Sequence, residues 1–203
     1  MAYFPLFTDI SNRCCLVAGG GNVACRKVKT LLKYGAAVRV VSEEICEELR
    51  NTLPKESLRF GQVHEKEIRE AFLVVAATSS REQNHRISRH CHQYGIPVNV
   101  ADSPEESSFL FPAIVRKGEI SIGINSGTGS PAVSKKLREE IEKVIPDCYA
   151  DISDWMGEIR KRVKTEIQEE NERRRILKTV AKEAFCAERI LTEEEVTQII
   201  KHR

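Results

Sequence analysis

Short apolar runs alternate with amphipathic stretches along the first half of the chain. The runs have strand length, whereas the stretches repeat apolar residues every three to four positions, as helices do. The apolar runs predict strands at Cys14–Ala18, Val38–Val41, Leu58–Phe60, Phe72–Ala77 and Pro97–Val100. The stretches between most of them predict helices at Ala24–Tyr34, Ser42–Leu53 and Arg81–Tyr94. This alternation predicts an α/β fold, a parallel sheet with helices on both faces.

The pattern changes after residue 112. Two further apolar runs, Ala113–Val115 and Glu119–Ile124, lie close together and predict a short hairpin. A second glycine-rich loop follows, and Ser130 at its end is a suitable N-cap for a helix over Pro131–Val144. This segment therefore differs in organisation from the alternating pattern before it.

The last part of the chain has a helical pattern throughout. An apolar stripe recurs every three to four residues, at Ile152, Trp155, Ile159, Val163 and Ile167. The charged run 169–175 is expected to be solvated, and Thr192–Glu195 has the spacing of a capping box for a last helix. These changes divide the chain into residues 1–112, 113–146 and 147–203.

The turn between the first strand and the first helix has the pattern Gly-x-Gly-x-x-Ala, from Gly19 to Ala24. The first glycine allows a tight turn, Gly21 allows backbone to approach a pyrophosphate, and Ala24 allows the helix to pack closely on the strand. The helix start supplies free N–H groups and the positive end of the helix dipole. An ordinary glycine-rich turn would show the same spacing. Within a strand–helix–strand unit, however, the pattern predicts a Rossmann-type dinucleotide site.

Three other loops follow predicted strands and should converge with Gly19–Asn22 on one crevice, because the carboxyl ends of parallel strands share one edge of a sheet. In the loop after the second strand, Glu43 and Glu44 are placed to bind an adenosine ribose. Both glutamates could instead merely favour the start of the next helix. No basic residue follows immediately to hold a 2′-phosphate, which favours NAD over NADP.

The ends of the fourth and fifth predicted strands supply the remaining candidates for this crevice. Small residues up to Thr78 would let a cofactor lie against backbone, and Asn99-Val100 ends the next strand. Asp102 follows them, where a carboxylate could accept a proton during a dehydrogenation or steer a cation. A cap for the turn at Ser103-Pro104 accounts for this aspartate equally well.

The second glycine-rich loop, Ser126–Ser130, also has two interpretations. Hydroxyl and glycine N–H groups at a helix start can bind an anion, and Lys135, Lys136 and Arg138 lie close behind in the sequence. Alternatively, Ser130 only caps the following helix, and the loop binds no ligand.

Composition excludes several classes of protein. The 32 basic and 30 acidic residues nearly balance, which gives no reason to expect nucleic acid or an anionic membrane as a partner. No apolar run approaches the roughly 20 residues that span a bilayer, and the apolar start lacks the basic region of a signal peptide. Seven cysteines without a Cys-x-x-Cys pair indicate reduced thiols and a cytoplasmic protein.

No metal site is predicted, because the side chains of His90-Cys91-His92 diverge on a helix. The chain also lacks Gly-Lys-Ser/Thr after its glycines and a Gly-x-Ser-x-Gly elbow, which argues against a P-loop hydrolase and a serine hydrolase.

Several segments in this order resemble the precorrin-2 dehydrogenase family, which includes the N-terminal module of siroheme synthases. The resemblance covers about residues 3–145 and rests on the segments at 3–7, 17–27, 76–78, 99–102 and 126–131. These read Tyr-Phe-Pro-Leu-Phe, Val-Ala-Gly-Gly-Gly-Asn-Val-Ala-Cys-Arg-Lys, Ala-Ala-Thr, Asn-Val-Ala-Asp and Ser-Gly-Thr-Gly-Ser-Pro. The ordered set is far more specific than any one of these motifs.

The resemblance implies NAD-dependent oxidation of precorrin-2 to sirohydrochlorin, on the way to siroheme or cobalamin precursors. It implies a Rossmann NAD-binding domain, a small dimerisation and substrate region, and a helical C-terminal domain, in a homodimer. Some family members also insert Fe²⁺ or Co²⁺, and the sequence leaves that activity open.

The resemblance also assigns site residues. Asp102 matches the essential aspartate of the family, and Ser126 matches a serine near its tetrapyrrole site. A departure is Glu43, where the family often has proline. With the motifs above, the expected cofactor contacts are Gly19, Gly21, Asn22, Val23, Glu43, Glu44, Thr78, Asn99 and Val100. The expected substrate contacts are Ser126, Thr128, Ser130, Arg116 and Lys135. The alternative is a non-catalytic, NAD-sensing regulatory protein with a Rossmann core.

Overall fold

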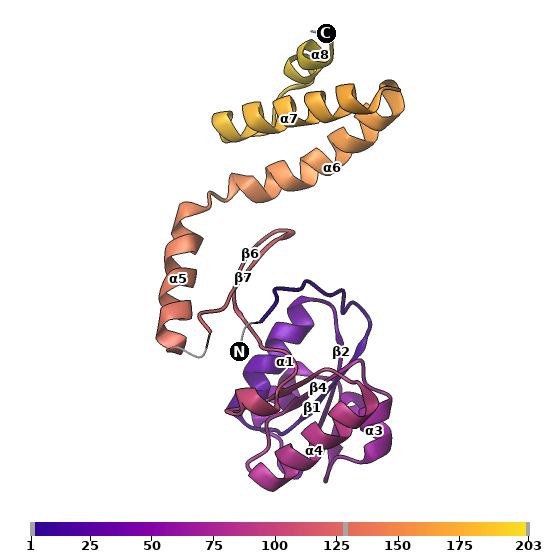
Figure 1. Ribbon diagram of the computed structural model, residues 1–203, viewed down its shortest axis with the longest axis vertical. Helices are drawn as coiled ribbons and strands as arrows, with labels where there is room; N and C mark the ends of the chain where they lie inside the picture. The colour runs from indigo at the N-terminus through magenta and orange to yellow at the C-terminus, as the bar shows by residue number, and fades with distance from the viewer. Residues whose placement is uncertain (1–2, 128–129, 202–203) are drawn as a thin grey trace. The chain divides into compact units, whose positions relative to one another are not determined.

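The chain forms two compact units, one spanning Tyr3–Phe111 and the other beginning at Pro112. The computed structural model describes residues 3–127 and 130–201 (Figure 1). Each unit has its own core. The further division that the sequence predicts at residue 146 stays a prediction.

The first unit contains a five-stranded parallel sheet in the order β3-β2-β1-β4-β5. Its strands are β1 Cys14–Ala18, β2 Ala37–Ser42, β3 Leu58–Phe60, β4 Leu73–Ala76 and β5 Val98–Val100. Its helices are α1 Asn22–Lys33, α2 Glu47–Thr52, α3 Glu65–Arg69 and α4 Arg81–Tyr94, with short 3₁₀ turns η1 Lys55–Ser57 and η2 Pro104–Glu106. The predicted Rossmann-type architecture is therefore confirmed.

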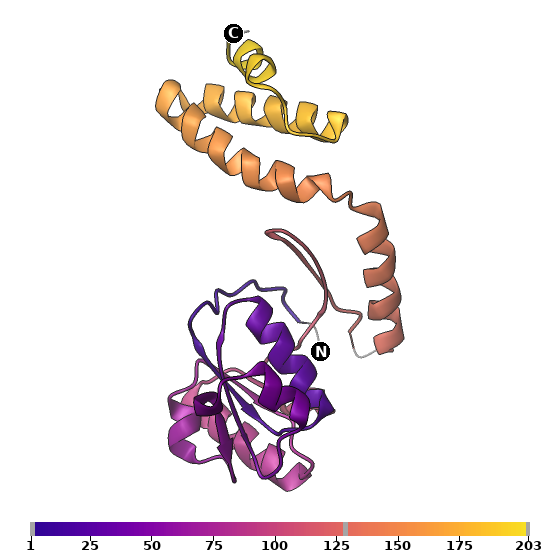
Figure 2. The same cartoon turned by 180° about the vertical axis from the view of Figure 1, so that it is seen from behind.

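Helices cover both faces of this sheet (Figure 2). Val17 of β1 packs with residues of α1 and α2 on one face, whereas its neighbour Leu16 packs with α3 and α4 on the other. Successive residues of a strand point to opposite faces, so β1 needs apolar residues at every position. The run Cys14–Ala18, which predicts this strand, is apolar at every position.

The strand register brings the carboxyl ends to one edge of the sheet. Ala18 at the end of β1 pairs with Val41 and with Ala76, and Ala76 pairs in turn with Val100. The chain order reverses between β1 and β4, which is where ligands bind in sheets of this kind.

The second unit begins with an antiparallel hairpin, β6 Ala113–Lys117 and β7 Ile120–Ile124. Gly118 makes its turn with φ +56°, a conformation that favours glycine. The helices that follow are α5 Pro131–Val144, α6 Cys148–Glu166, α7 Glu170–Ala187 and α8 Glu193–Lys201. Helix α5 has its predicted bounds. The predicted hairpin is present, but its first strand extends to Lys117 and its second begins at Ile120.

The helices α6, α7 and α8 share one core. The predicted stripe is confirmed, because Ile152, Ile159 and Val163 are buried and Trp155 packs against them. The charged run is largely exposed, as expected, but it opens α7, and Glu169 accepts hydrogen bonds from the N–H groups of residues 171 and 172. The predicted capping box is present, with Thr192 N–H donating to Glu195 and Glu195 N–H donating to Thr192.

One predicted helix is wrong in its extent. The sequence predicts a helix over Ser42–Leu53, but Ser42 ends β2 and α2 begins only at Glu47. The reason is a tertiary contact, because the N–H of Cys46 donates to the carbonyl oxygen of Gly20 at 2.9 Å and holds residues 43–46 in a loop.

Candidate functional site

The turn after β1 is built from three glycines with different surroundings. Gly19 has φ +122°, and a Cβ atom there would lie 2.2 Å from the carbonyl oxygen of Ala77. A Cβ atom on Gly20 would lie 2.0 Å from the carbonyl oxygen of Glu44. A Cβ atom on Gly21 would meet nothing within 4 Å. The first two glycines therefore let the turn pack against neighbouring loops, and the third leaves open space before α1.

That open space lies at the start of α1. Gly21 is the N-cap and offers no side chain to the first turn, which also contains no acidic residue. The N–H groups of a first helical turn lack partners within the helix and carry the positive end of its dipole. This arrangement suits an anion such as the diphosphate of a dinucleotide. Asn22 is exposed at the same place.

A cavity of about 380 Å³ opens where the ends of β4 and β5 meet the start of α1. Four of the sequence candidates line it: Val23, Thr78, Val100 and Asp102. The other lining residues are Ala77, Ser79, Arg81, Asn84, Ala101, Ser103 and Glu106. The structure thus brings the helix start and the candidate aspartate to one cavity.

Asp102 lines this cavity and has an unusual backbone conformation. Its φ is +59°, in the left-handed region, and the residue is exposed. Aspartate and asparagine tolerate this region better than other residues with a Cβ atom. Within residues 3–127 and 130–201, the Asp102 carboxylate has no hydrogen-bond partner and no ion pair within 4 Å. It therefore remains available to a ligand.

Asn99 lies apart from this cavity. It is nearly buried in β5, and its side-chain amide donates to the carbonyl oxygen of Phe109 at 3.1 Å. The amide thus holds the segment that returns from η2, and the expected cofactor contact of this residue stays a prediction.

Asn84 is a residue of this cavity that the sequence pattern does not single out. Its side chain accepts from the N–H and the hydroxyl of Thr78, at 3.1 and 2.7 Å, and donates to the Thr78 carbonyl at 3.1 Å. These three bonds fix the loop between β4 and α4. The signal available in the sequence was an asparagine in the first turn of a helix that follows a loop of small residues.

Lys27 is the second residue that sequence reasoning misses. It lies one turn after Val23 on α1, and its Nζ atom is 4.0 Å from the centre of the Phe111 ring. Burial, aided by the charge of Arg26, lowers the pKa of Lys27 to about 8, whereas the Asp102 carboxylate acts in the opposite direction. Lys27 is thus a half-buried lysine whose pKa lies below its ordinary value.

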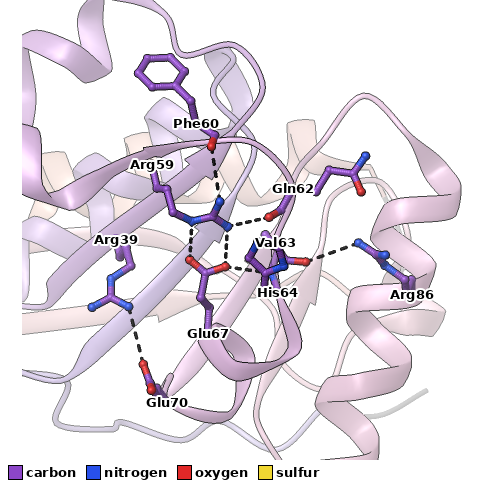
Figure 3. A network of polar contacts seen from close by, with 9 residues as sticks. All are labelled: Arg39, Arg59, Phe60, Gln62, Val63, His64, Glu67, Glu70 and Arg86. Atoms are coloured by element: carbon purple, nitrogen blue, oxygen red, sulfur yellow. Dashed lines mark hydrogen bonds and ion pairs between the residues drawn. The ribbon is translucent and has the colours of Figure 1, made fainter.

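The two glutamates after β2 are exposed, as a ribose contact requires. Glu43 accepts a hydrogen bond from the side-chain amide of Gln62 at 3.3 Å. The Gln62 carbonyl oxygen in turn accepts from Arg59 at 2.6 Å, within the network drawn in Figure 3. The backbone of Glu44 contacts the glycine turn through Gly20.

Contacts of the same network stabilise the loop between β3 and α3. Arg59 donates to both carboxylate oxygens of Glu67, at 2.7 and 2.6 Å (Figure 3). Burial alone would raise the pKa of Glu67, but the hydrogen bonds from Arg59 and from the N–H of His64 outweigh burial and lower it. The loop that carries Gln62 is therefore held in place beside Glu43.

The substrate candidates belong to the second unit. The Ser126 and Ser134 hydroxyls are 2.7 Å apart, and the Ser130 hydroxyl accepts from the N–H of Ala132 at 3.2 Å, as the predicted N-cap. Arg116 is exposed and donates to the carbonyl oxygen of Gly118 at 3.2 Å. Lys135 is exposed on α5, and Thr128 lies outside the described residues. Their contact with a substrate stays a prediction.

Two features are absent from residues 3–127 and 130–201. In this part of the chain, no three His, Cys, Asp or Glu side chains converge as metal ligands. No helix in the same range is long and apolar enough to cross a membrane.

The architecture and the glycine turn agree with a known family. The family model described as "Putative NAD(P)-binding" matches residues 6–113, which include the whole sheet and the cavity. The chain belongs to this family. The NAD(P)-binding domain thus accounts for the first unit.

Sequence relatives of this NAD(P)-binding protein extend beyond the matched domain. A siroheme synthase from Nitrosospira multiformis is 38% identical over 192 residues, which cover 92% of this chain and 41% of that protein. A siroheme synthase from Actinobacillus succinogenes is 38% identical over 177 residues, which cover 86% of this chain and 37% of that protein. The chain therefore spans about two fifths of the length of these curated relatives.

A solved structure described as SirC, precorrin-2 dehydrogenase, has the same fold. It superposes with a TM-score of 0.75 at 22% sequence identity and covers 98% of both chains. The similarity covers both units, so the hairpin and the helices after it also have counterparts in the fold of that structure.

Proposed function

We propose that this chain is an NAD-dependent dehydrogenase that oxidises precorrin-2 to sirohydrochlorin in the synthesis of siroheme. The observation that carries the proposal is the cavity at the switch point of the sheet, which is lined both by Asp102 and by Val23 in the first turn of α1. The relatives named as siroheme synthases and the fold shared with a precorrin-2 dehydrogenase support this substrate.

The residues present fit NAD. The N–H groups at Gly21–Val23 would hold the diphosphate, since the first turn of α1 is open and has no acidic side chain. Glu43 and Glu44 would bind the adenosine ribose, and their negative charge disfavours a 2′-phosphate. When bound, NAD⁺ supplies the acceptor for the hydride that leaves the substrate.

The oxidation removes a hydride and a proton from precorrin-2, and Asp102 is the residue that we assign to the proton. An exposed carboxylate without a protein partner can accept a proton directly from a bound substrate. Precorrin-2 carries several carboxylates, which Arg116 and Lys135 would bind as cations. Ser126, Thr128 and Ser130 would supply hydroxyl groups at the same part of the substrate.

We infer that the protein acts as a homodimer. Helix α5 exposes three large apolar side chains, with 49% of Val133, 40% of Leu137 and 74% of Val144 accessible. Exposed apolar residues that recur along one helix support contact with another protein surface.

We also propose a cytoplasmic location. The seven cysteines form no disulfide, which fits a reducing compartment such as the cytoplasm.

The direct test mixes the purified chain with NAD⁺ and precorrin-2 and follows the absorbance of NADH and sirohydrochlorin. The variant Asp102→Asn keeps the left-handed backbone favourable and removes the proton acceptor. We expect it to lose at least about 100-fold in kcat, the usual contribution of a general base, and to bind NAD normally. The control is Asp151→Asn, an exposed change on α6.

Each outcome separates one hypothesis from another. Binding of NAD without turnover by the wild-type chain would favour the regulatory alternative. Full turnover by Asp102→Asn would remove Asp102 from the mechanism but leave the dehydrogenase. Addition of Fe²⁺ or Co²⁺ to the product in the same cuvette tests whether the chain also uses a metal ion as a substrate.

A further inference from the structure

Asp102 has a backbone conformation that must be held in place by its surroundings. Its φ is +59°, and left-handed backbone is disfavoured for residues with a Cβ atom, although aspartate tolerates it better than most. Asp102 lies within a turn, because the N–H of Ser103 donates to the carbonyl oxygen of Val100 at 3.3 Å. Before Asp102, the N–H of Ala101 donates to the carbonyl oxygen of Ala76 at 2.8 Å and joins the turn to β4. Such a conformation persists only where the structure around it fixes it, so contacts are also required after Asp102.

Glu106, the last residue of η2, supplies contacts on that side of the turn. Its N–H donates to the carbonyl oxygen of Ser103 at 3.2 Å, directly after Asp102. The same oxygen accepts a hydrogen bond from the Ser107 hydroxyl at 3.0 Å, and that hydroxyl accepts from the N–H of Val100 at 2.8 Å. Glu106 also lines the cavity together with Asp102. The turn of Asp102 and η2 therefore form one hydrogen-bonded unit.

Helix α4 holds Glu106 through side chains on one of its faces. His85, Ser88 and His92 are three and four positions apart, so they lie on the same side of the helix. The Ser88 hydroxyl donates to the Glu106 carbonyl oxygen at 2.7 Å, and the Nε2 atom of His92 lies 3.3 Å from that oxygen. The Nδ1 atom of His85 lies 2.7 Å from the carboxylate oxygen Oε1 of Glu106. Three side chains of α4 thus contact one residue, and within the described part of the chain none of the three lines the cavity.

The surroundings of Ser88 and His85 indicate what these contacts do. Ser88 is only 3% exposed, and a buried hydroxyl requires a partner. A serine in a helix can find one in the carbonyl group four residues before it, but Ser88 bonds to Glu106 and so ties α4 to η2. The His85 side chain is 57% exposed, and an exposed pair of this kind adds little to stability. The effect of the His85–Glu106 pair is therefore on the orientation of η2 more than on the stability of the fold.

We propose that His85 and Ser88 are positioning residues, which act through Glu106 to hold the turn of Asp102 in the geometry for proton transfer. This inference rests on the proposed dehydrogenase function, in which Asp102 accepts the substrate proton. The contacts that fix the turn come from backbone groups and neighbouring residues, which leaves the Asp102 carboxylate to the substrate. Such support affects the rate, because a displacement of a catalytic group by about 1 Å can lower it about 100-fold.

The first experiment removes both side-chain contacts to Glu106 in a double variant with His85→Ala and Ser88→Ala. We expect kcat to fall by about 10- to 100-fold, because misplacement of a catalytic group has effects of this size. Kd for NAD should stay close to that of the wild type, since the open start of α1 is unchanged. Alanine is the best helix former, so α4 should remain intact. The matched control is a double variant with Arg89→Ala and Gln93→Ala, two exposed changes on the same helix.

A conservative variant of His85 tests whether its hydrogen bond matters. His85→Ala alone should lower kcat by about 3- to 10-fold, the usual contribution of one hydrogen bond. His85→Asn should restore kcat to near the wild-type value, because the asparagine amide can donate to the Glu106 carboxylate. Equal kcat in these two variants would contradict the inference. This comparison still decides the question if the double variant fails to fold, as judged by circular dichroism.

The background Asp102→Asn separates positioning from a general effect on the fold. If His85 and Ser88 act through Asp102, their replacement by alanine should cause no further loss of kcat in this background. A further loss as large as the one in the wild-type background would refute the inference. Wild-type kcat in the double variant of an active chain would refute it as well.

The second experiment measures hydrogen exchange by NMR and does not depend on turnover. In the double variant, the Ser103 N–H should exchange about 5- to 150-fold faster, the combined effect of two typical hydrogen bonds. The Ala101 N–H, which bonds to β4, should stay protected and is the internal control. Unchanged exchange at Ser103 would show that α4 does not hold the turn. Faster exchange in a chain whose wild type has no dehydrogenase activity would refute the proposed function and leave the support of the turn by α4 intact.

Discussion

Neighbouring glycines in the turn after β1 should respond in opposite ways to the same substitution. Gly20→Ala places a methyl group 2.0 Å from the Glu44 carbonyl oxygen, whereas Gly21→Ala places it in open space. The backbone of Gly21, with φ −90° and ψ −171°, is unstrained for alanine. The first change should therefore affect the fold, and the second should affect the ligand.

The magnitudes follow from packing. For Gly20→Ala, overpacking against backbone costs about 1–3 kcal/mol, and each kcal/mol lowers Tm by about 2–4 °C in a chain of this size. For Gly21→Ala, the lower entropy of the unfolded chain contributes about 0.4–1 kcal/mol and opposes a small loss at the N-cap. Its stability should therefore stay close to that of the wild type.

The effect of Gly21→Ala should appear in cofactor binding. A methyl group that obstructs the approach of the diphosphate costs about 1–3 kcal/mol, which raises Kd for NAD about 5- to 160-fold. Calorimetric titration with NAD⁺ measures Kd, and a thermal melt of the same sample measures Tm. A stable Gly21→Ala protein with wild-type Kd would refute the placement of the diphosphate at this turn. A Gly20→Ala protein with wild-type Tm would refute the packing argument.

Three more predictions concern other parts of the chain. Asn84→Ala removes three hydrogen bonds to Thr78. It should lower the free energy of unfolding by about 1–3 kcal/mol, as measured by urea denaturation. An unchanged denaturation midpoint would contradict the structural role of this side chain. Glu43→Gln removes the proposed ribose acceptor together with its negative charge, which would disfavour a 2′-phosphate. The ratio of Kd for NADP to Kd for NAD should therefore fall in titrations with both cofactors. An unchanged ratio would count against the ribose contact. Hydrogen bonds from Arg189 and Thr192 lower the pKa of Glu195 from its ordinary value of 4.5 to about 2. Its contribution to stability is thus present above pH 4.5 and is lost as the pH falls towards 2. Glu195→Gln should flatten this part of the pH–stability curve, and a curve identical to that of the wild type would exclude the linkage.

Much of the sheet could be predicted because its central strands are apolar on both faces. Cys14–Ala18 has the predicted bounds, since a short apolar run bounded by turn residues is typical of a strand in a parallel sheet. Leu58–Phe60 also has its predicted bounds, although it is an edge strand that contains Arg59. Arg81–Tyr94 also has its predicted bounds, with Ser80 as its N-cap and Gly95 at its end in the left-handed conformation. Local chemistry determines these elements.

Contacts between distant segments could not be predicted in this way. The late start of α2 depends on the hydrogen bond from Cys46 to Gly20, and no local pattern indicates it. The short helix α3 is held by the pairing of Arg59 with Glu67, and its five residues are too few for an apolar repeat to indicate a helix. The contact of the Lys27 ammonium with the Phe111 ring likewise joins residues more than eighty positions apart in the chain. Side-chain partners of this kind emerge only from the fold.

The hydrogen bond between Cys46 and Gly20 has a consequence for how small ligands should bind. Together with the bond from Gly19 N–H to the Val41 carbonyl, it joins the loop of the two glutamates to the glycine turn before any ligand arrives. A preorganised pocket loses little conformational entropy on binding. In the proposed binding mode adenosine monophosphate would contact only these two loops, so it should bind with high efficiency per atom. Fragment-based inhibitors of this protein would accordingly start from the adenosine end.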